Sequence, residues 1–176
     1  MRRNWGIVAV LAVLLAVASG CGDSKVPPTQ WASKVCAAVG PWRAQIASLN
    51  AQAQQQVSAA SSPDQVRTSL LSLLSGAAVA SDNARQAVVS AGVPDVEGGD
   101  TVAARFADSL TRAREAYRHA GSDLASLPTT DATSFYDGVV AVMNRLQTEY
   151  AASALDTSNL DSPALRDAFD GVDQCR

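Results

Sequence analysis

The spacing of apolar residues constrains the fold of this chain more than any other feature. Beyond Trp31 they recur every three or four residues, which is the repeat of an amphipathic helix, and no strand-like alternation interrupts them. Residues 135–150 are typical, with Phe135, Val139, Met143, Leu146 and Tyr150. Similar stripes begin near Trp31, Val66 and Val102. We therefore predict an all-α protein with four main helices and a short C-terminal helix after Ser162-Pro163.

Start and stop signals divide the stripes into separate helices. Ser62, Pro63 and Gln65 form the pattern of a capping box with proline at the first helical position. The other candidate N-cap residues are Thr29, Asp100 or Thr101, and Thr130 or Asp131. Short connections favour antiparallel neighbours, so we predict an up-down bundle whose two chain ends lie at the same end.

The first helix contains a helix breaker in its middle. Gly40-Pro41 should interrupt it, because proline removes one hydrogen bond and crowds the carbonyl group four residues earlier. The apolar stripe nevertheless passes through the pair in register, from Val39 to Trp42. We expect either a kinked helix or two short collinear helices.

The first 20 residues have the organisation of an export signal. Arg2 and Arg3 precede an apolar stretch that ends in small residues just before Cys21. The stretch is short for a membrane span, which needs about 20 apolar residues. The string VASGC, residues 17–21, resembles the lipobox of bacterial lipoproteins, although the family prefers leucine at the position of Ala18.

This resemblance implies that a diacylglycerol is attached to the thiol of Cys21 and that the chain is cut before it. Residues 1–20 are then a lipoprotein signal peptide, residues 21–29 the lipidated cysteine and a short tether, and residues 30–176 a single helical domain. Two acyl chains hold a protein on a membrane far better than one. The alternatives are cleavage by an ordinary signal peptidase, which releases a soluble protein, and an uncleaved anchor helix.

Two further cysteines, Cys36 and Cys175, lie near the two ends of the predicted domain. An exported protein matures in an oxidising compartment, where an isolated pair of cysteines usually forms a disulfide. A redox-active or metal-binding pair is the alternative, but such pairs usually lie close together, as in C-x-x-C. We expect a structural disulfide that closes nearly the whole domain.

The composition offers little for catalysis. With 14 basic and 17 acidic residues the net charge is −3, which argues against nucleic acid as a partner. Nucleophile-elbow and phosphate-loop motifs are absent from the sequence. His119, the single histidine, lies four residues after Glu115, and this pair suits a solvated helix face better than a metal site. We expect a non-catalytic protein without metal or cofactor.

A few residues are candidates for contact with a ligand or partner. Trp31 and Trp42 lie about three helical turns apart on one face and suit stacking on a lipid tail or sugar, or simply a core. Arg112 and Arg118 belong to the run TRAREAYRH, which suits an anion or a mixed-charge surface. Asp167, Asp170 and Asp173 are grouped near the C-terminus, where acidic residues usually keep a surface soluble.

Beyond the lipobox, the stretch WASKVC…PW (residues 31–42) and the terminal cysteine resemble small secreted lipoproteins of actinobacteria. The resemblance transfers no catalytic residue. We predict a protein-interaction module, anchored on the extracytoplasmic face of the cell membrane through Cys21 and serving an envelope protein. The alternative is a carrier or sensor that binds a small ligand between its helices. The alanine-rich second half of the second helix argues against a large cavity.

Overall fold

The computed structural model describes residues 25–58, 61–153, 160 and 162–175. The signal peptide and Cys21 therefore lie outside the described residues. The helices are α1 (Pro28–Gln56), α2 (Pro63–Ser90), α3 (Gly99–Ser126), α4 (Ala132–Ala152) and α5 (Pro163–Gly171), followed by the 3-10 turn η2 (Asp173–Cys175). Within the described part of the chain there is no β-strand. The predicted all-α fold is confirmed.

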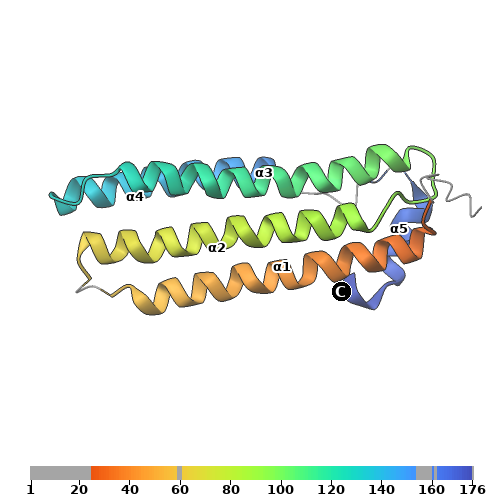
Figure 1. Ribbon diagram of the computed structural model, residues 1–176, viewed down its shortest axis with the longest axis horizontal. Helices are drawn as coiled ribbons and strands as arrows, with labels where there is room; N and C mark the ends of the chain where they lie inside the picture. The colour runs from red at the N-terminus through yellow and green to blue at the C-terminus, as the bar shows by residue number, and fades with distance from the viewer. Residues whose placement is uncertain (1–24, 59–60, 154–159, 161, 176) are drawn as a thin grey trace, which may run out of the picture.

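The four long helices run up and down along one axis (Figure 1). α2 packs against both α1 and α3, and α3 packs in turn against α4. The start of α1, the connection between α2 and α3, and α5 share one end of the bundle, which we call the near end (Figure 1). The opposite end, with the α1–α2 and α3–α4 connections, is the far end. The predicted up-down topology with both chain ends at one end is confirmed.

The predicted starts of α2, α4 and α5 are confirmed by their hydrogen bonds. The Gln65 amide donates to Ser62 Oγ over 3.4 Å, and the Ser62 amide donates to Gln65 Oε1 over 2.8 Å, which completes the capping box. Asp131 Oδ1 accepts a hydrogen bond of 2.8 Å from the Ser134 amide. Ser162 caps α5 in the same manner.

Two predicted caps are wrong. α1 begins before Thr29, because Pro28 takes the first helical position, where its missing N–H is not needed. α3 begins at Gly99, ahead of both Asp100 and Thr101, with Gly98 at the cap position in the left-handed conformation (φ 68°). Glycine adopts that conformation without steric cost, so the connection turns directly into the helix.

α1 continues through Gly40 and Pro41 as one helix, so the alternative of two separate helices is wrong. Proline disfavours the helical conformation of the residue before it, because its ring clashes with that residue's Cβ. Gly40 has no Cβ, which removes this clash. Both residues are exposed, so water can solvate the carbonyl group that loses its helical partner.

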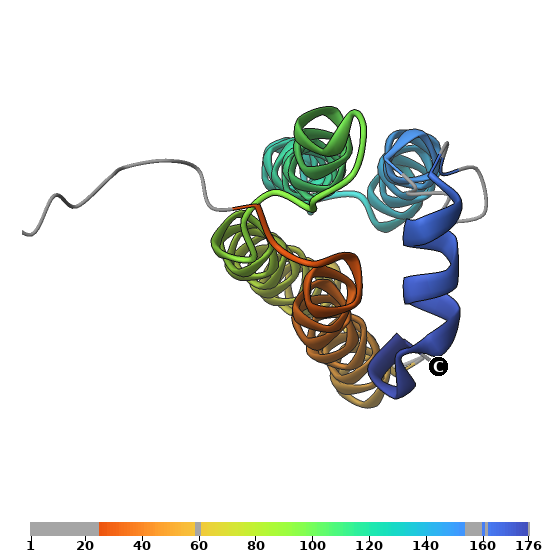
Figure 2. The same ribbon diagram turned by 90° about the vertical axis from the view of Figure 1, so that its right-hand side faces the viewer.

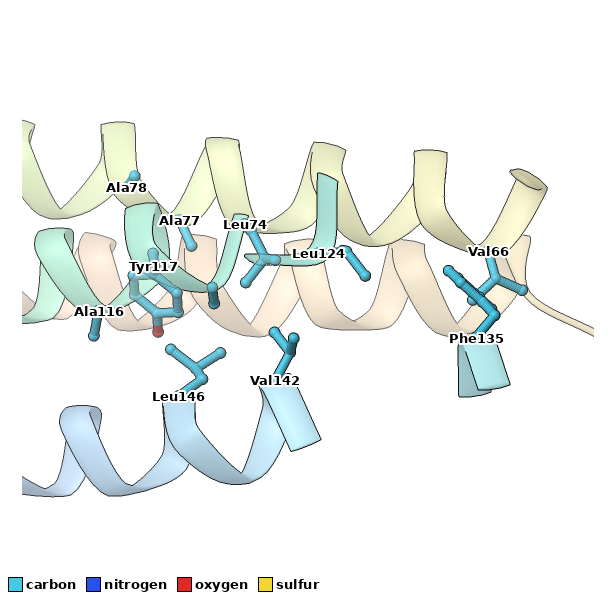
Figure 3. Packing of buried hydrophobic residues seen from close by; sticks show 11 residues of the cluster. Val66, Leu74, Ala77, Ala78, Ala116, Tyr117, Leu124, Phe135, Val142 and Leu146 are labelled. Carbon is cyan, nitrogen blue, oxygen red and sulfur yellow. The ribbon is translucent and has the colours of Figure 1, made fainter. Parts of the chain in front are cut away.

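The core consists of two main clusters along the bundle. The first fills the middle and far part, where Leu74 of α2, Tyr117 of α3 and Leu146 of α4 point toward one another (Figure 3). The second surrounds Trp31 at the near end. Small residues of α2, among them Ala77, Ala80 and Ala84, are buried, and α2 makes its most extensive contact with α3.

A disulfide joins Cys36 of α1 to Cys175 of η2, with their Cα atoms 5.0 Å apart. It connects residues separated by 139 positions, so it links the two ends of the described domain. The predicted pairing is confirmed, because the bundle brings both chain ends to its near end.

Candidate functional site

One side of the bundle is incompletely packed. In the described residues α1 packs against α2, α5 and η2, whereas it makes little direct contact with α4 (Figure 2). At the near end α5 lies across this side, between α4 and α1 (Figure 2). Beyond α5, toward the far end, the side remains open.

The open part forms a cleft of about 320 Å³, which we call the α1–α4 cleft. Its volume lies within the range of about 300–1,000 Å³ that is typical of small-molecule sites. Four helices contribute to it: Ile46, Leu49 and Asn50 of α1, Leu73 and Ala77 of α2, Tyr117 of α3, and Met143, Asn144, Leu146, Gln147 and Tyr150 of α4.

The cleft has an apolar floor and a polar, uncharged rim. Leu146 and Ala77 are buried in the floor, and Ala77 has no exposed surface. The side-chain amides of Asn50, Asn144 and Gln147 belong to exposed residues and form the rim. An amide both donates and accepts hydrogen bonds, so this rim suits a neutral polar group.

The cleft is open because the second half of α1 buries little of its own surface. Ile46 and Leu49 are only partly buried, although both pack against the core of the other helices. On the opposite lip Met143 is 37 % exposed. The small Ala77 lies between them and leaves the space unfilled. Ala77, in the alanine-rich part of α2, thus lines the cleft, although the sequence had suggested only that this part argues against a large cavity.

Two tyrosines close the cleft toward the near end. The rings of Tyr117 and Tyr150 lie 5.8 Å apart, and Tyr117 is buried. Burial, with a smaller contribution from Tyr150, raises the pKa of the Tyr117 hydroxyl well above its ordinary value. The Tyr117 hydroxyl therefore stays neutral at physiological pH.

A second hollow, of about 370 Å³, lies beside the disulfide. Val39 and Arg43 of α1 line it, together with Phe106 of α3 and Phe169 of α5. Val39, Arg43 and Ile46 follow one another at helical spacing, so both hollows lie along one face of α1.

The two tryptophans predicted as contact residues have structural partners. Trp31 has no exposed surface, and its ring meets those of Phe106 and Phe169 edge-on at 5.1 and 5.9 Å. Trp42 is half-buried and donates from Nε1 to Ser81 Oγ over 3.0 Å. Both side chains therefore pack in the near-end core, which was the second interpretation of their spacing.

The predicted arginines do not come together. Arg112 is exposed, and Arg118 contacts Glu115 Oε2 over 3.2 Å beside a groove of about 670 Å³ between α2 and α3. Arg114 bridges Asp82 (2.8 Å) and Glu115 (2.6 Å) in the same region. Its hydrogen bonds are the main reason that the pKa values of both carboxyl groups lie below their ordinary values. These contacts describe a mixed-charge surface.

His119 finds its partner on another helix. Its Nδ1 atom lies 3.1 Å from Glu149 Oε2 of α4, so it links α3 to α4. In the part of the chain that the structure describes, no three metal-ligating side chains are grouped together. The sequence spacing suggested Glu115 as the partner, because it gives no information on contacts between helices.

The rim residues of the cleft were missed by sequence reasoning. Asn50 lies one turn after Ile46, and Gln147 one turn after Met143. The available signal was therefore an amide that directly follows a leucine of the apolar stripe on each of two helices. A single sequence does not show that these two positions face each other.

Comparison with known proteins finds no match to a protein-family model, a curated protein or a solved structure. None of the described helices has the combination of length and apolar character that crossing a membrane requires.

Proposed function

We propose that this chain is a lipoprotein, anchored through Cys21 on the extracytoplasmic face of the cell membrane, whose helical domain is a non-catalytic protein-interaction module. A segment of an envelope protein binds in the α1–α4 cleft. The observation that carries this proposal is that α5 covers only the near part of an otherwise open side of the bundle (Figure 1). The anchor is supported by VASGC and by the apolar stretch before it.

The packing of α5 indicates the kind of segment that fits. This short amphipathic helix buries Leu165 and Ala168, and its Phe169 stacks on Phe106 with ring centroids 5.7 Å apart. The side of the bundle thus accepts a helix that presents apolar side chains to it. The cleft continues the same face of α1, so a second amphipathic helix, supplied by the partner, is the natural occupant.

The rim defines the chemistry of the partner. Asn50, Asn144 and Gln147 offer hydrogen bonds without charge, and none of the residues that line the cleft is charged. The contacting face of the partner helix is then apolar in its centre and neutral and polar at its edges. Because charge pairs are not involved, the affinity should depend little on salt concentration.

A small-ligand carrier is the second candidate, and the volume of the cleft favours it. A hollow of about 320 Å³ with an apolar floor and a few polar groups at its edge has the usual character of a small-molecule site. A neutral, partly apolar molecule suits it for the same reasons as a partner helix.

Native mass spectrometry distinguishes these candidates, using protein extracted in detergent from its own membranes. A stable complex with a second polypeptide supports the interaction module. A smaller excess mass that is released on unfolding supports the carrier instead. If only the lipidated chain is recovered, from cross-linked and from uncross-linked membranes, this result would contradict both the interaction module and the carrier. A chain without lipid on Cys21 would contradict the anchor.

A pair of substitutions on α4 tests the cleft itself. Met143→Lys places a charge on its lip, whereas Val140→Lys changes a residue of the same helix that is 59 % exposed and does not line the cleft. We expect Met143→Lys to abolish the complex and Val140→Lys to leave it intact, with equal helicity by circular dichroism. Equal binding by both variants would place the partner elsewhere.

A further inference from the structure

The chain is fixed to the bundle before its first helix begins. The Val26 amide donates to the Val93 carbonyl oxygen over 2.7 Å, and the Asp95 amide donates to the Val26 carbonyl oxygen over 2.8 Å. These two hydrogen bonds form a short parallel bridge to the connection between α2 and α3. Residues 26–29 therefore belong to the folded domain, and the predicted tether over residues 21–29 is too long.

The shorter tether limits the distance between domain and membrane. From Cys21 to Val26 a fully extended chain spans at most about 17–18 Å. α3, with 28 residues, is about 42 Å long. The tether is thus much shorter than the bundle that it holds, and it is attached at one end of that bundle.

We propose that the near end is the membrane-facing surface of the domain and that the α1–α4 cleft is held at a fixed height above the bilayer. This inference rests on the proposed lipidation of Cys21. Ile46 and Asn50 lie 18 and 22 residues beyond the start of α1, which places the cleft about 27–33 Å from the near end. The cleft opens sideways, so its partner segment must be exposed at that height.

The charge of the near end indicates that the tether alone sets this arrangement. Asp95, Glu97 and Asp100 are exposed there and outnumber Lys25, the exposed lysine next to the bridge, so the acidic charge at this end has the same sign as anionic lipid headgroups. The near end therefore does not adhere to an anionic bilayer. Increasing the fraction of anionic lipid should not bring the domain closer to the surface.

Energy transfer to an acceptor lipid tests the orientation. Glu97→Cys places a label at the near end and Thr130→Cys one at the far end, both at exposed positions in the full, exported chain. The introduced thiol is available for labelling when Cys36 and Cys175 are bonded and Cys21 is lipidated. In vesicles of neutral lipid we expect energy transfer to the acceptor lipid from the label at position 97. We expect little or no energy transfer from the label at position 130. Equal transfer from both labels would overturn the inference.

Lengthening the tether gives a matched control. A short Gly-Ser insertion between Ser24 and Lys25 should lower transfer from the near label, and Val26→Pro, which removes the amide donor to Val93, should act in the same direction. Lys25→Ala should change nothing. Unchanged transfer with the insertion would show that the domain adheres to the bilayer directly, which contradicts the inference.

Failure of this inference can be distinguished from failure of the anchor. The mass of each labelled protein is measured first. Absence of lipid on Cys21 contradicts the proposed anchor, and the orientation falls with it. Lipid on Cys21 with equal transfer from both labels contradicts the orientation alone and leaves the proposed function in place.

Discussion

The indole nitrogen of Trp31 donates a hydrogen bond of 2.9 Å to the carbonyl oxygen of Gly92. The bond ties the first turn of α1 to the connection that follows α2, next to the hydrogen bond from the Val26 amide to the Val93 carbonyl oxygen. Gly92 has a positive φ of 84°, which turns the chain away from α2 and toward α3. The near end is therefore held together by local backbone geometry and by a side chain from a distant helix.

Loss of this bond should destabilise the domain. Trp31→Phe keeps an aromatic ring but removes the donor to a part-buried carbonyl, so we expect a loss of about 1–3 kcal/mol in the free energy of unfolding. Urea unfolding measures it. Trp42→Phe is the control, because Trp42 is only half-buried and its Ser81 partner also bonds to the Ala77 carbonyl oxygen. Equal losses would show that the Gly92 bond has no special role.

The disulfide should contribute stability without determining the fold. Cross-linking residues 139 positions apart restricts the unfolded chain, which corresponds to about 4–5 kcal/mol on the chain-entropy model. Replacing both Cys36 and Cys175 by serine should lower the melting temperature and leave the helicity unchanged. Thermal unfolding followed by circular dichroism tests this. An unchanged melting temperature, or free thiols on the unreduced exported protein, would contradict it.

Two glycines of α3 should respond in opposite directions to alanine. A Cβ at Gly99 would lie 2.1 Å from the Pro94 carbonyl oxygen, so Gly99→Ala should cost about 1–3 kcal/mol or more. A Cβ at Gly121 would lie at an ordinary distance of 3.9 Å from Leu74 Cβ, so Gly121→Ala should stabilise by about 0.5–1 kcal/mol. Chemical unfolding of both variants is the measurement. Similar effects of the two changes would contradict the packing.

The ion pairs that Arg114 of α3 makes with Asp82 of α2 and with Glu115 should make stability sensitive to acid. The pKa values of Asp82 and Glu115 are lowered from 3.8 and 4.5, mainly by hydrogen bonds from Arg114. Because the pKa values of these two carboxyl groups are lower in the folded protein than in the unfolded chain, the unfolded chain binds protons at a higher pH. The contribution is therefore complete above about pH 5 and is lost as the pH falls through and below the ordinary pKa values.

Arg114→Gln should reduce this acid sensitivity, since it removes the common partner of both carboxylates. Arg112→Gln, an exposed residue of the same helix, is the control. The measurement is the free energy of unfolding between pH 3 and pH 7 for both variants and the parent chain. The same pH dependence in all three would show that the Arg114 pairs do not couple to folding.

Local patterns in the sequence predicted the helices and several caps, because these depend on neighbouring residues. The disulfide could be predicted because an isolated pair of cysteines usually forms one in an oxidising compartment. The Ser62–Gln65 capping box is an interaction within a single helical turn. The cap of α3 was missed because it depends on Gly98, whose left-handed conformation follows from how the connection packs. The continuous apolar stripe around Pro41 left one helix or two collinear helices as alternatives, and only the structure shows that α1 is one helix.

The sequence by itself determined that the chain is an all-α bundle with its ends together, because helical periodicity and short connections are encoded locally. The tertiary structure alone decided which side of that bundle remains open. The α1–α4 cleft depends on the relative placement of helices that are nearly 100 residues apart in the chain, on the small Ala77 between them, and on the position of α5. The choice of Glu149 as the partner of His119 has the same origin, since such contacts arise only when separate helices pack.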